Sequence, residues 1–369
     1  MKLGAKIGLG FAALLGIAAF LGILAVWNMS KVMDQTVMLD EEYVPEVAIA
    51  NQVERMLLAT MYEMRGYGFT QEEKFLAEGR QHLVAVGQAI GEAKDLAAKA
   101  EHLVKLKGSV EEIEAGVKEY ASLVEQTVAT NAKMAENRSQ LDAAAQQYMK
   151  SCNDFLNAQN QAMEEEIAAG AKADKLKERL LKITLVNDVI DVGNDTRRMV
   201  WRAQAERDPK ALQEAQKNFE IMAAKFNQLR SITRQEVNLR QIAQTEEAGN
   251  AYKTAMNAFL TNWQNNEDLA KNRGETGAKV TTLAQSLAKV GMEETAKIAD
   301  SAATSLSVSS KVMIVGLIIA LVVGIALAIF LTRAITGPVL KGVKFAETVA
   351  AGDLSQELDI RQKDEIGQL

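Results

Sequence analysis

Two apolar helical seams are each interrupted by one asparagine and one arginine, and this pattern points most directly to a binding chemistry. Asn131 and Arg138 interrupt the first seam, and Asn266 and Arg273 interrupt the second. A buried guanidinium is unfavourable unless it is paired. A carboxylate ligand could supply that partner, because guanidinium and carboxylate join through two parallel hydrogen bonds. The alternative is a polar layer in which the arginines pair with glutamate or stay exposed.

Neighbouring polar residues complete two predicted pockets for organic anions. At about 1.5 Å of rise per helical residue, Thr60 falls near the first asparagine and arginine, and Thr196 falls near the second asparagine. The candidate ligand-binding residues are Thr60, Arg65, Asn131, Arg138, Thr196, Arg197, Asn266 and Arg273. We expect Trp201 and Trp263 to be packing residues, with an aromatic wall for a ligand as the alternative.

Other chemistries lack the residues that they need. One cysteine, Cys152, and two histidines are too few for a zinc cluster or an intramolecular disulfide. The net charge of −6, without a long basic run, argues against nucleic-acid binding. No phosphate-binding glycine loop or nucleophile elbow is present. We therefore expect no metal, cofactor or nucleic acid, and no enzyme activity. The acidic run 164–166 predicts a solvated helix face.

The elements that position these residues are predicted to be helices, because 48% of the chain is apolar, only 5% is aromatic and only three residues are proline. Residues 7–27 and 312–332 are uncharged and long enough to cross a membrane. A cleaved signal peptide is the alternative for the first. Lysines and arginines precede the first run and follow the second. Since such residues favour the cytoplasmic side, we expect residues 1–6 and the C-terminal end in the cytoplasm. We expect residues 28–311 to lie outside, in the periplasm if the membrane is a bacterial inner membrane.

Three short motifs follow the second run, within residues 333–369: Ile335-Thr336-Gly337-Pro338, Ala351-Gly352-Asp353-Leu354 and Asp364-Glu365-Ile366-Gly367. Pro338 suits the first turn of a helix, and Gly352 suits the left-handed position that ends one. In this order the motifs resemble part of a HAMP domain, which links membrane helices to cytoplasmic outputs. The resemblance implies relay roles for Pro338, Gly352, Asp353, Leu354, Asp364 and Glu365. We expect an output domain to follow Leu369.

The external region is predicted to contain a duplicated three-helix unit. An offset of about 135 residues aligns Asn131 with Asn266, and chance similarity of two alanine-rich helical sequences is the alternative. The relative helix lengths predict two stacked four-helix bundles that share the third and sixth helices. The expected helices are 28–67, 71–106, 109–169, 172–207, 209–239 and 242–310.

This architecture resembles the helical bimodular sensor domain of bacterial methyl-accepting chemoreceptors. The resemblance implies a homodimer that binds small molecules, commonly organic acids, and signals to cytoplasmic chemotaxis proteins through a domain absent from this chain. A transmembrane chemoreceptor is therefore the leading hypothesis. A sensor histidine kinase or nucleotide cyclase with the same front end is the second, and a structural membrane anchor is the third.

Overall fold

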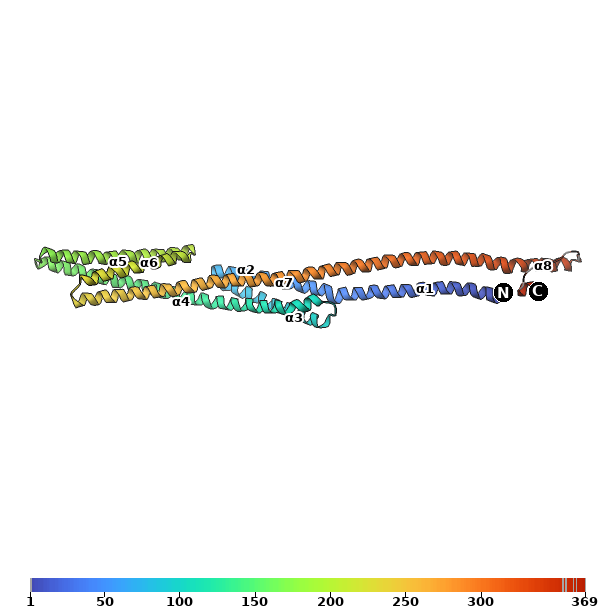
Figure 1. Cartoon of the computed structure of the whole chain (residues 1–369), viewed down its shortest axis with the longest axis horizontal. Helices are drawn as coiled ribbons and strands as arrows, with labels where there is room; N and C mark the ends of the chain where they lie inside the picture. Colours follow the sequence, from blue (N-terminus) through green and yellow to red (C-terminus); the bar gives the residue numbers. More distant parts are fainter. Residues whose placement is uncertain (1, 354, 356, 361, 363, 369) are drawn as a thin grey trace. The chain divides into compact units, whose positions relative to one another are not determined.

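The computed structural model describes residues 2–353, 355, 357–360, 362 and 364–368, and every regular element in them is a helix. The all-helical prediction is therefore confirmed for the described residues. The elements are α1 (Leu3–Met38), a π-helical segment (Leu39–Tyr43), α2 (Val44–Thr70), α3 (Glu73–Lys99), α4 (Val104–Ala168), α5 (Ala173–Glu206), α6 (Pro209–Ser231), α7 (Glu236–Leu331), a second π-helical segment (Thr332–Thr336), α8 (Gly337–Ala350) and α9 (Glu365–Gln368) (Figure 1).

Local chemistry explains two of the helix ends. Asp208 caps α6, because its side chain accepts a 2.9 Å hydrogen bond from the Lys210 amide and Pro209 occupies the first turn. Gly170 has a φ of +67° after α4, as expected for a residue that ends a helix. The predicted break near residue 240 is wrong, because α6 ends at Ser231 and α7 begins at Glu236. No glycine or proline marks that turn.

Backbone contacts divide the chain into two compact units. The first unit comprises Met1–Asn51, Gly91–Ser109 and Gln285–Leu369, and the second comprises Gln52–Ile90 and Val110–Ala284. All candidate ligand-binding residues lie in the second unit, and the described candidate relay residues lie in the first.

One hydrophobic core of the second unit takes its side chains from α4, α5, α6 and α7. Tyr148, Val189, Phe219 and Phe259 represent the four helices in this core. Gly193 allows α5 to approach α4 closely, because a Cβ atom at this position would lie 2.6 Å from the Tyr148 ring. Close packing of this kind makes the position intolerant of added volume.

A different set of contacts in the second unit joins α2 and α3 to other stretches of α4 and α7. The Phe75 ring of α3 lies against Gly66 of α2, where a Cβ atom would come within 2.6 Å. Arg80 of α3 pairs with Glu125 of α4 at 2.7 Å. Gly277 of α7 packs against side chains of α2 and α4. The long helices α4 and α7 therefore contact α5 and α6 along one stretch and α2 and α3 along another.

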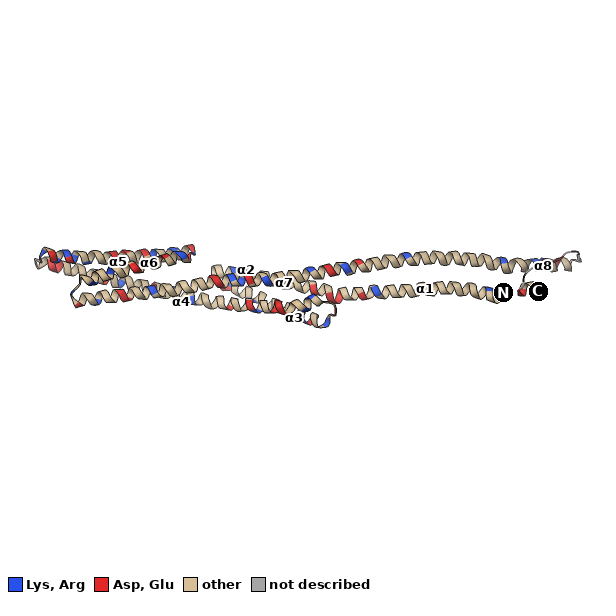
Figure 2. Cartoon of the chain, in the orientation of Figure 1, with Lys and Arg blue, Asp and Glu red and all other residues tan. Residues whose placement is uncertain are grey.

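The first unit contains the two described helical runs that are long and apolar enough to cross a membrane, within Leu3–Thr70 and Glu236–Ala350. Large apolar side chains such as Leu15 and Leu317 are exposed along these runs. Figure 2 shows a long stretch of α1 and of α7 without a charged residue. The two stretches contact each other, because a Cβ atom at Gly10 would lie 3.3 Å from Leu327.

The segment after the second apolar run agrees in part with the expected local structure. Pro338 lies in the first turn of α8, but α8 follows α7 and the second π-helical segment without a break in the helix. The chain leaves α8 through Gly352, whose φ of +92° confirms the predicted left-handed position. Leu354, one of the predicted relay residues, lies outside the described residues.

Candidate functional site

The second unit contains a polar cleft of about 280 Å³ between the α2–α3 turn, the end of α5, and the facing sides of α4 and α7. We call it the junction cleft. This volume lies just below the range of about 300–1,000 Å³ that is typical of drug-sized ligands, so the cleft suits a smaller molecule. Its lining residues are Gly68, Phe69, Thr70, Gln71, Met134, Arg138, Gln204, Arg207, Phe259, Trp263 and Asn266.

Two exposed arginines line the cleft. The Nε atom of Arg138 donates a 2.9 Å hydrogen bond to the side-chain oxygen of Gln204, and its guanidinium lies 5.8 Å from the centroid of the Phe259 ring. The Nη2 atom of Arg207 donates a 2.6 Å hydrogen bond to the carbonyl of Phe69. The same guanidinium lies 3.8 Å from the centroid of the Phe69 ring. Aromatic faces and neutral oxygens thus hold both guanidiniums in place.

A third arginine, Arg273, lies behind the wall of the cleft and is only 6% exposed. It donates a 2.5 Å hydrogen bond to the Thr127 hydroxyl and a 3.4 Å hydrogen bond to the Met64 carbonyl. A Cβ atom at Gly68, which lines the cleft, would lie 3.8 Å from its Nη2 atom. Burial lowers the pKa of Arg273, and its electrostatic interaction with Tyr120 opposes this shift.

The three arginines differ from many others in the chain in the groups that they contact. Each donates to neutral oxygens, and none lies within 4.0 Å of a carboxylate in the described part of the chain. Elsewhere Arg80, Arg179, Arg198, Arg202 and Arg230 are each paired with Asp or Glu. The guanidiniums around the junction cleft therefore lack an acidic partner, and a bound carboxylate would provide one.

An asparagine pair lies beside the arginines. The Nδ2 atom of Asn266 donates a 3.0 Å hydrogen bond to Oδ1 of Asn131. The Nδ2 atom of Asn131 is buried and has no hydrogen-bond partner among the described residues. Next to this pair, Asn265 donates to the Thr130 hydroxyl at 3.2 Å. In each pair the two residues are 135 positions apart in the sequence. Positions that the predicted repeat makes equivalent therefore face each other across α4 and α7.

The other predicted ligand-binding residues do not line the cleft. The hydroxyl groups of Thr60 and Thr196 are buried and donate to carbonyls of their own helices at 2.8 and 2.7 Å. Arg65 is exposed on α2, and Arg197 lines a separate pocket. In place of two pockets with an arginine each, the structure places Arg138 and Asn266 in one cleft, with Asn131 and Arg273 behind it.

Sequence reasoning missed Gln204, Arg207 and Phe69. The first two lie at the end of α5, and Arg207 adopts a left-handed φ of 56° where that helix ends. The Asp208-Pro209 step had indicated a helix boundary here. A helix boundary alone does not reveal that the α2–α3 turn lies opposite, since this requires the long-range packing of the unit.

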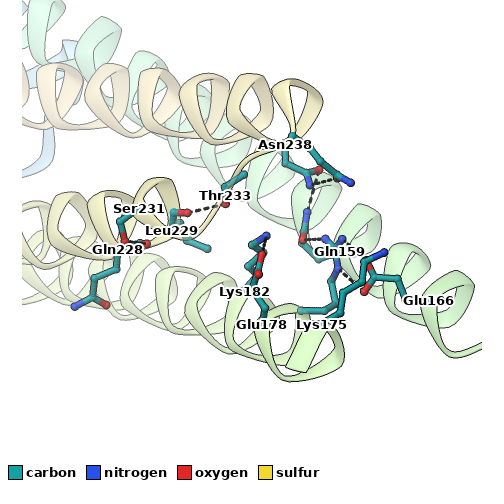
Figure 3. Close-up of polar contacts among 12 residues, drawn as sticks. Gln159, Glu166, Lys175, Glu178, Lys182, Gln228, Leu229, Ser231, Thr233 and Asn238 are labelled. Carbon is teal, nitrogen blue, oxygen red and sulfur yellow. Dashed lines mark hydrogen bonds and ion pairs between the residues drawn. The ribbon is translucent and has the colours of Figure 1, made fainter. Parts of the chain in front are cut away.

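A buried polar network near the α4–α5 turn was also missed. Arg179 pairs with Glu166 at 2.7 Å and donates to Gln159, whose amide donates to Asn238 at 3.3 Å (Figure 3). The prediction of a solvated face is wrong for Glu166, which is buried. The Arg179 hydrogen bond lowers the pKa of this carboxyl. Since these groups satisfy one another, the network ties α4, α5 and α7 together and leaves no vacant charge for a ligand.

The remaining predicted relay residues make contacts within the first unit. Asp364 accepts a 2.6 Å hydrogen bond from the Lys6 ammonium, and Glu365 accepts one of 2.7 Å from the Leu3 amide. Asp353 accepts from the Ser355 amide at 3.0 Å. These carboxylates therefore hold the turn after α8 and the start of α9 in place through local and terminal contacts.

No family model and no curated protein matches the chain. Among solved structures, it is similar to the sensor domain of the histidine kinase sensor TorS from V. parahaemolyticus, with a TM-score of 0.41, 12% identity, and coverage of 66% of this chain and 99% of that one. It is also similar to the TorS sensor domain in a complex with TorT in the presence of TMAO, with a TM-score of 0.40, 13% identity, and coverage of 67% and 99%. These are distant likenesses, and the residues of the chain itself carry the functional argument.

Proposed function

We propose that this chain is a transmembrane receptor that binds a small organic anion in the junction cleft. The observation that carries the proposal is that Arg138 and Arg207 line one cleft, with Arg273 buried behind its wall, and none of the three has an acidic partner among the described residues. A carboxylate can accept two hydrogen bonds from a guanidinium, and Arg is the side chain best suited to this geometry. The amides of Asn266 and Gln204 add further donors at the same wall.

We infer that the chain crosses the membrane twice, at residues 7–27 and 312–332, with both termini in the cytoplasm. Residues 28–311 then form the external sensor, built from two stacked four-helix bundles that share α4 and α7. The two apolar helical runs support the spans, and the two sets of helix contacts in the second unit support the bundles. From the resemblance of the sequence to chemoreceptor sensor domains we also infer that the protein is a homodimer in a bacterial inner membrane.

The signal would travel along α7. This helix carries Asn266 and Arg273 of the site and continues without interruption to Leu331. An anion that draws the Arg273 guanidinium towards the cleft changes the contacts that α7 makes with α4 and α2. Such a change shifts a conformational equilibrium only if the ligand binds the two states with different affinity. Small sliding movements of packed helices are an established form of such switching.

We infer that residues 333–369 act as a HAMP-type relay, with Pro338 and Gly352 at the start and end of its first helix. The chain itself would then bind and transmit, while an output domain performs the response. A chemoreceptor for chemotaxis and a sensor histidine kinase or cyclase share this front end. The type of output domain discriminates them: a long methyl-accepting coiled coil indicates chemotaxis, and a phospho-acceptor histidine or cyclase motif indicates an enzyme.

A thermal-shift screen of the full chain in lipid nanodiscs tests the anion site. We expect one or more small mono- or dicarboxylates to raise the melting temperature. The increase should shrink in Arg138→Gln and in Arg207→Asn, since asparagine tolerates left-handed backbone. Arg202→Gln is the matched control, because Arg202 is exposed on α5 and already paired with Glu206. Equal ligand shifts in all four proteins would refute the proposed site.

A further inference from the structure

A second pocket of about 270 Å³ lies between α4, α5 and α7, away from the residues of the junction cleft. Asp142 and Ala145 of α4, Arg197 and Trp201 of α5, and Tyr252 of α7 are among its lining residues. Its volume again suits a small ligand rather than a drug-sized one. It differs from the junction cleft in that it presents both a cation and a carboxylate.

The two charges in this pocket do not neutralise each other by direct contact. Neither Arg197 nor Asp142 forms an ion pair within 4.0 Å in the described part of the chain, although both are only partly exposed. On the same helix α5, the neighbouring Arg198 does pair with Asp195. Opposite charges that share a pocket without closing an ion pair leave room for a ligand that carries both charges itself.

Tyr252 of α7 adds an aromatic ring to the same pocket lining. The ring is fixed by edge-on packing against Phe219, with the ring centroids 5.4 Å apart. Burial raises the pKa of Tyr252; the positive charge of Arg197 lowers it and the negative charge of Asp142 raises it further. The pocket therefore holds both charges together with a fixed aromatic ring.

Apart from Gln146, the remaining lining consists of aliphatic and aromatic residues. Trp201 is 64% exposed, and it shares this lining with the buried Val200 and Leu141. Large aromatic side chains that stay partly in water often form contact surfaces for ligands, since they bury much area with little loss of freedom. This wall would cover an apolar side chain of the ligand.

We propose that this pocket binds a free α-amino acid, with Arg197 on the carboxylate, Asp142 on the ammonium and Trp201 against the side chain. A zwitterion offers a carboxylate and an ammonium a few bonds apart, so it can pair with both pocket charges at once. The site goes beyond the anion site proposed above and does not depend on it. The two sites share no lining residue.

Titration calorimetry of the full chain in nanodiscs with the twenty natural amino acids tests this pocket. We expect at least one with an apolar side chain to bind saturably. Its N-acetyl derivative, which lacks the ammonium, and its amide, which lacks the carboxylate, should each bind at least tenfold more weakly. The proposal is overturned if no amino acid binds, or if both analogues bind as tightly as the parent.

Variants that remove one charge each test which pocket residue pairs with which charged group of the ligand. Arg197→Gln and Asp142→Asn should each weaken binding of the amino acid at least tenfold, whereas Arg198→Gln, with its ion pair to Asp195, is the matched control. Asp142→Asn should not weaken binding of the N-acetyl derivative, because that ligand has no ammonium for Asp142 to pair with. Arg138→Gln should leave amino-acid binding unchanged. If it abolished this binding while Arg197→Gln did not, the amino acid would occupy the junction cleft and this proposal would fall.

Discussion

Replacing Glu46 with glutamine should remove a pH dependence from the stability of the first unit. Glu46 of α2 is only 2% exposed, and its Oε1 atom has no hydrogen-bond partner among the described residues. Its Oε2 atom lies against α7, 2.9 Å from where a Cβ atom of Gly291 would be. Burial, with a smaller contribution from the negative charge of Glu42, raises the pKa of Glu46 from 4.5 to about 7. The folded protein therefore holds this proton more tightly than the unfolded chain does.

The sign and size of the effect follow from that difference. Between pH 4.5 and about 7 the folded state binds more protons than the unfolded state, so stability falls as pH rises through this window. Above the window the loss is complete and constant. At about 1.4 kcal/mol for each pH unit between the two pKa values, the loss amounts to roughly 3 kcal/mol. Glu46→Gln mimics the protonated form, so it should gain stability relative to the wild type above neutral pH.

The assay is thermal unfolding of the full chain in nanodiscs, followed by circular dichroism at several pH values from 5 to 8.5. The melting temperature of Glu46→Gln relative to the wild type should rise across the window and then level off. Glu41→Gln is the matched control, since Glu41 is exposed in the preceding π-helical segment. If wild type and Glu46→Gln melted in parallel at every pH, the carboxylate would not be held unpaired against α7 as described.

Three further predictions concern packing, the buried network and topology. Gly193→Ala should lower stability by about 1–3 kcal/mol in thermal unfolding, because its methyl would lie 2.6 Å from a buried tyrosine ring, whereas Gly87→Ala, with open space, should not. Arg179→Met should cost about 3 kcal/mol in the same assay, since it leaves Glu166 buried without its partner; a change below 0.5 kcal/mol would contradict this. With the native cysteine replaced, Lys172→Cys should react with a membrane-impermeant maleimide in intact cells, and Lys341→Cys should react only after lysis. The reverse labelling pattern would contradict the proposed topology.

Features that depend on local chemistry could be predicted from the sequence. The apolar runs, the helix start at Pro338 and the left-handed Gly352 each follow from residues within a few positions. The offset of 135 residues also had a structural counterpart, because Asn131 and Asn266 face each other across two helices. A repeat predicts such pairing when two related units pack around a local twofold axis.

Features that depend on long-range packing could not be predicted. Helical spacing placed Arg138 and Arg273 on equivalent seams, yet one is exposed and the other buried, because different helices cover them. Glu166 follows two exposed glutamates, and only the arrival of Arg179 from the next helix makes its burial favourable. The cleft itself combines residues from α2 and α5, which no local pattern brings together.

The anion site is tested most directly by titration calorimetry of small carboxylates into the full chain in nanodiscs, with the wild type compared with the Arg138→Gln/Arg207→Asn double variant. We expect saturable binding of at least one acid to the wild type. The double variant should bind it at least about a hundredfold more weakly, because each of the two lost charge-assisted hydrogen bonds contributes about 1.5–3 kcal/mol. Equal affinity in the two proteins, or no binding of any acid to the wild type, would contradict the assignment of an anion site to the junction cleft.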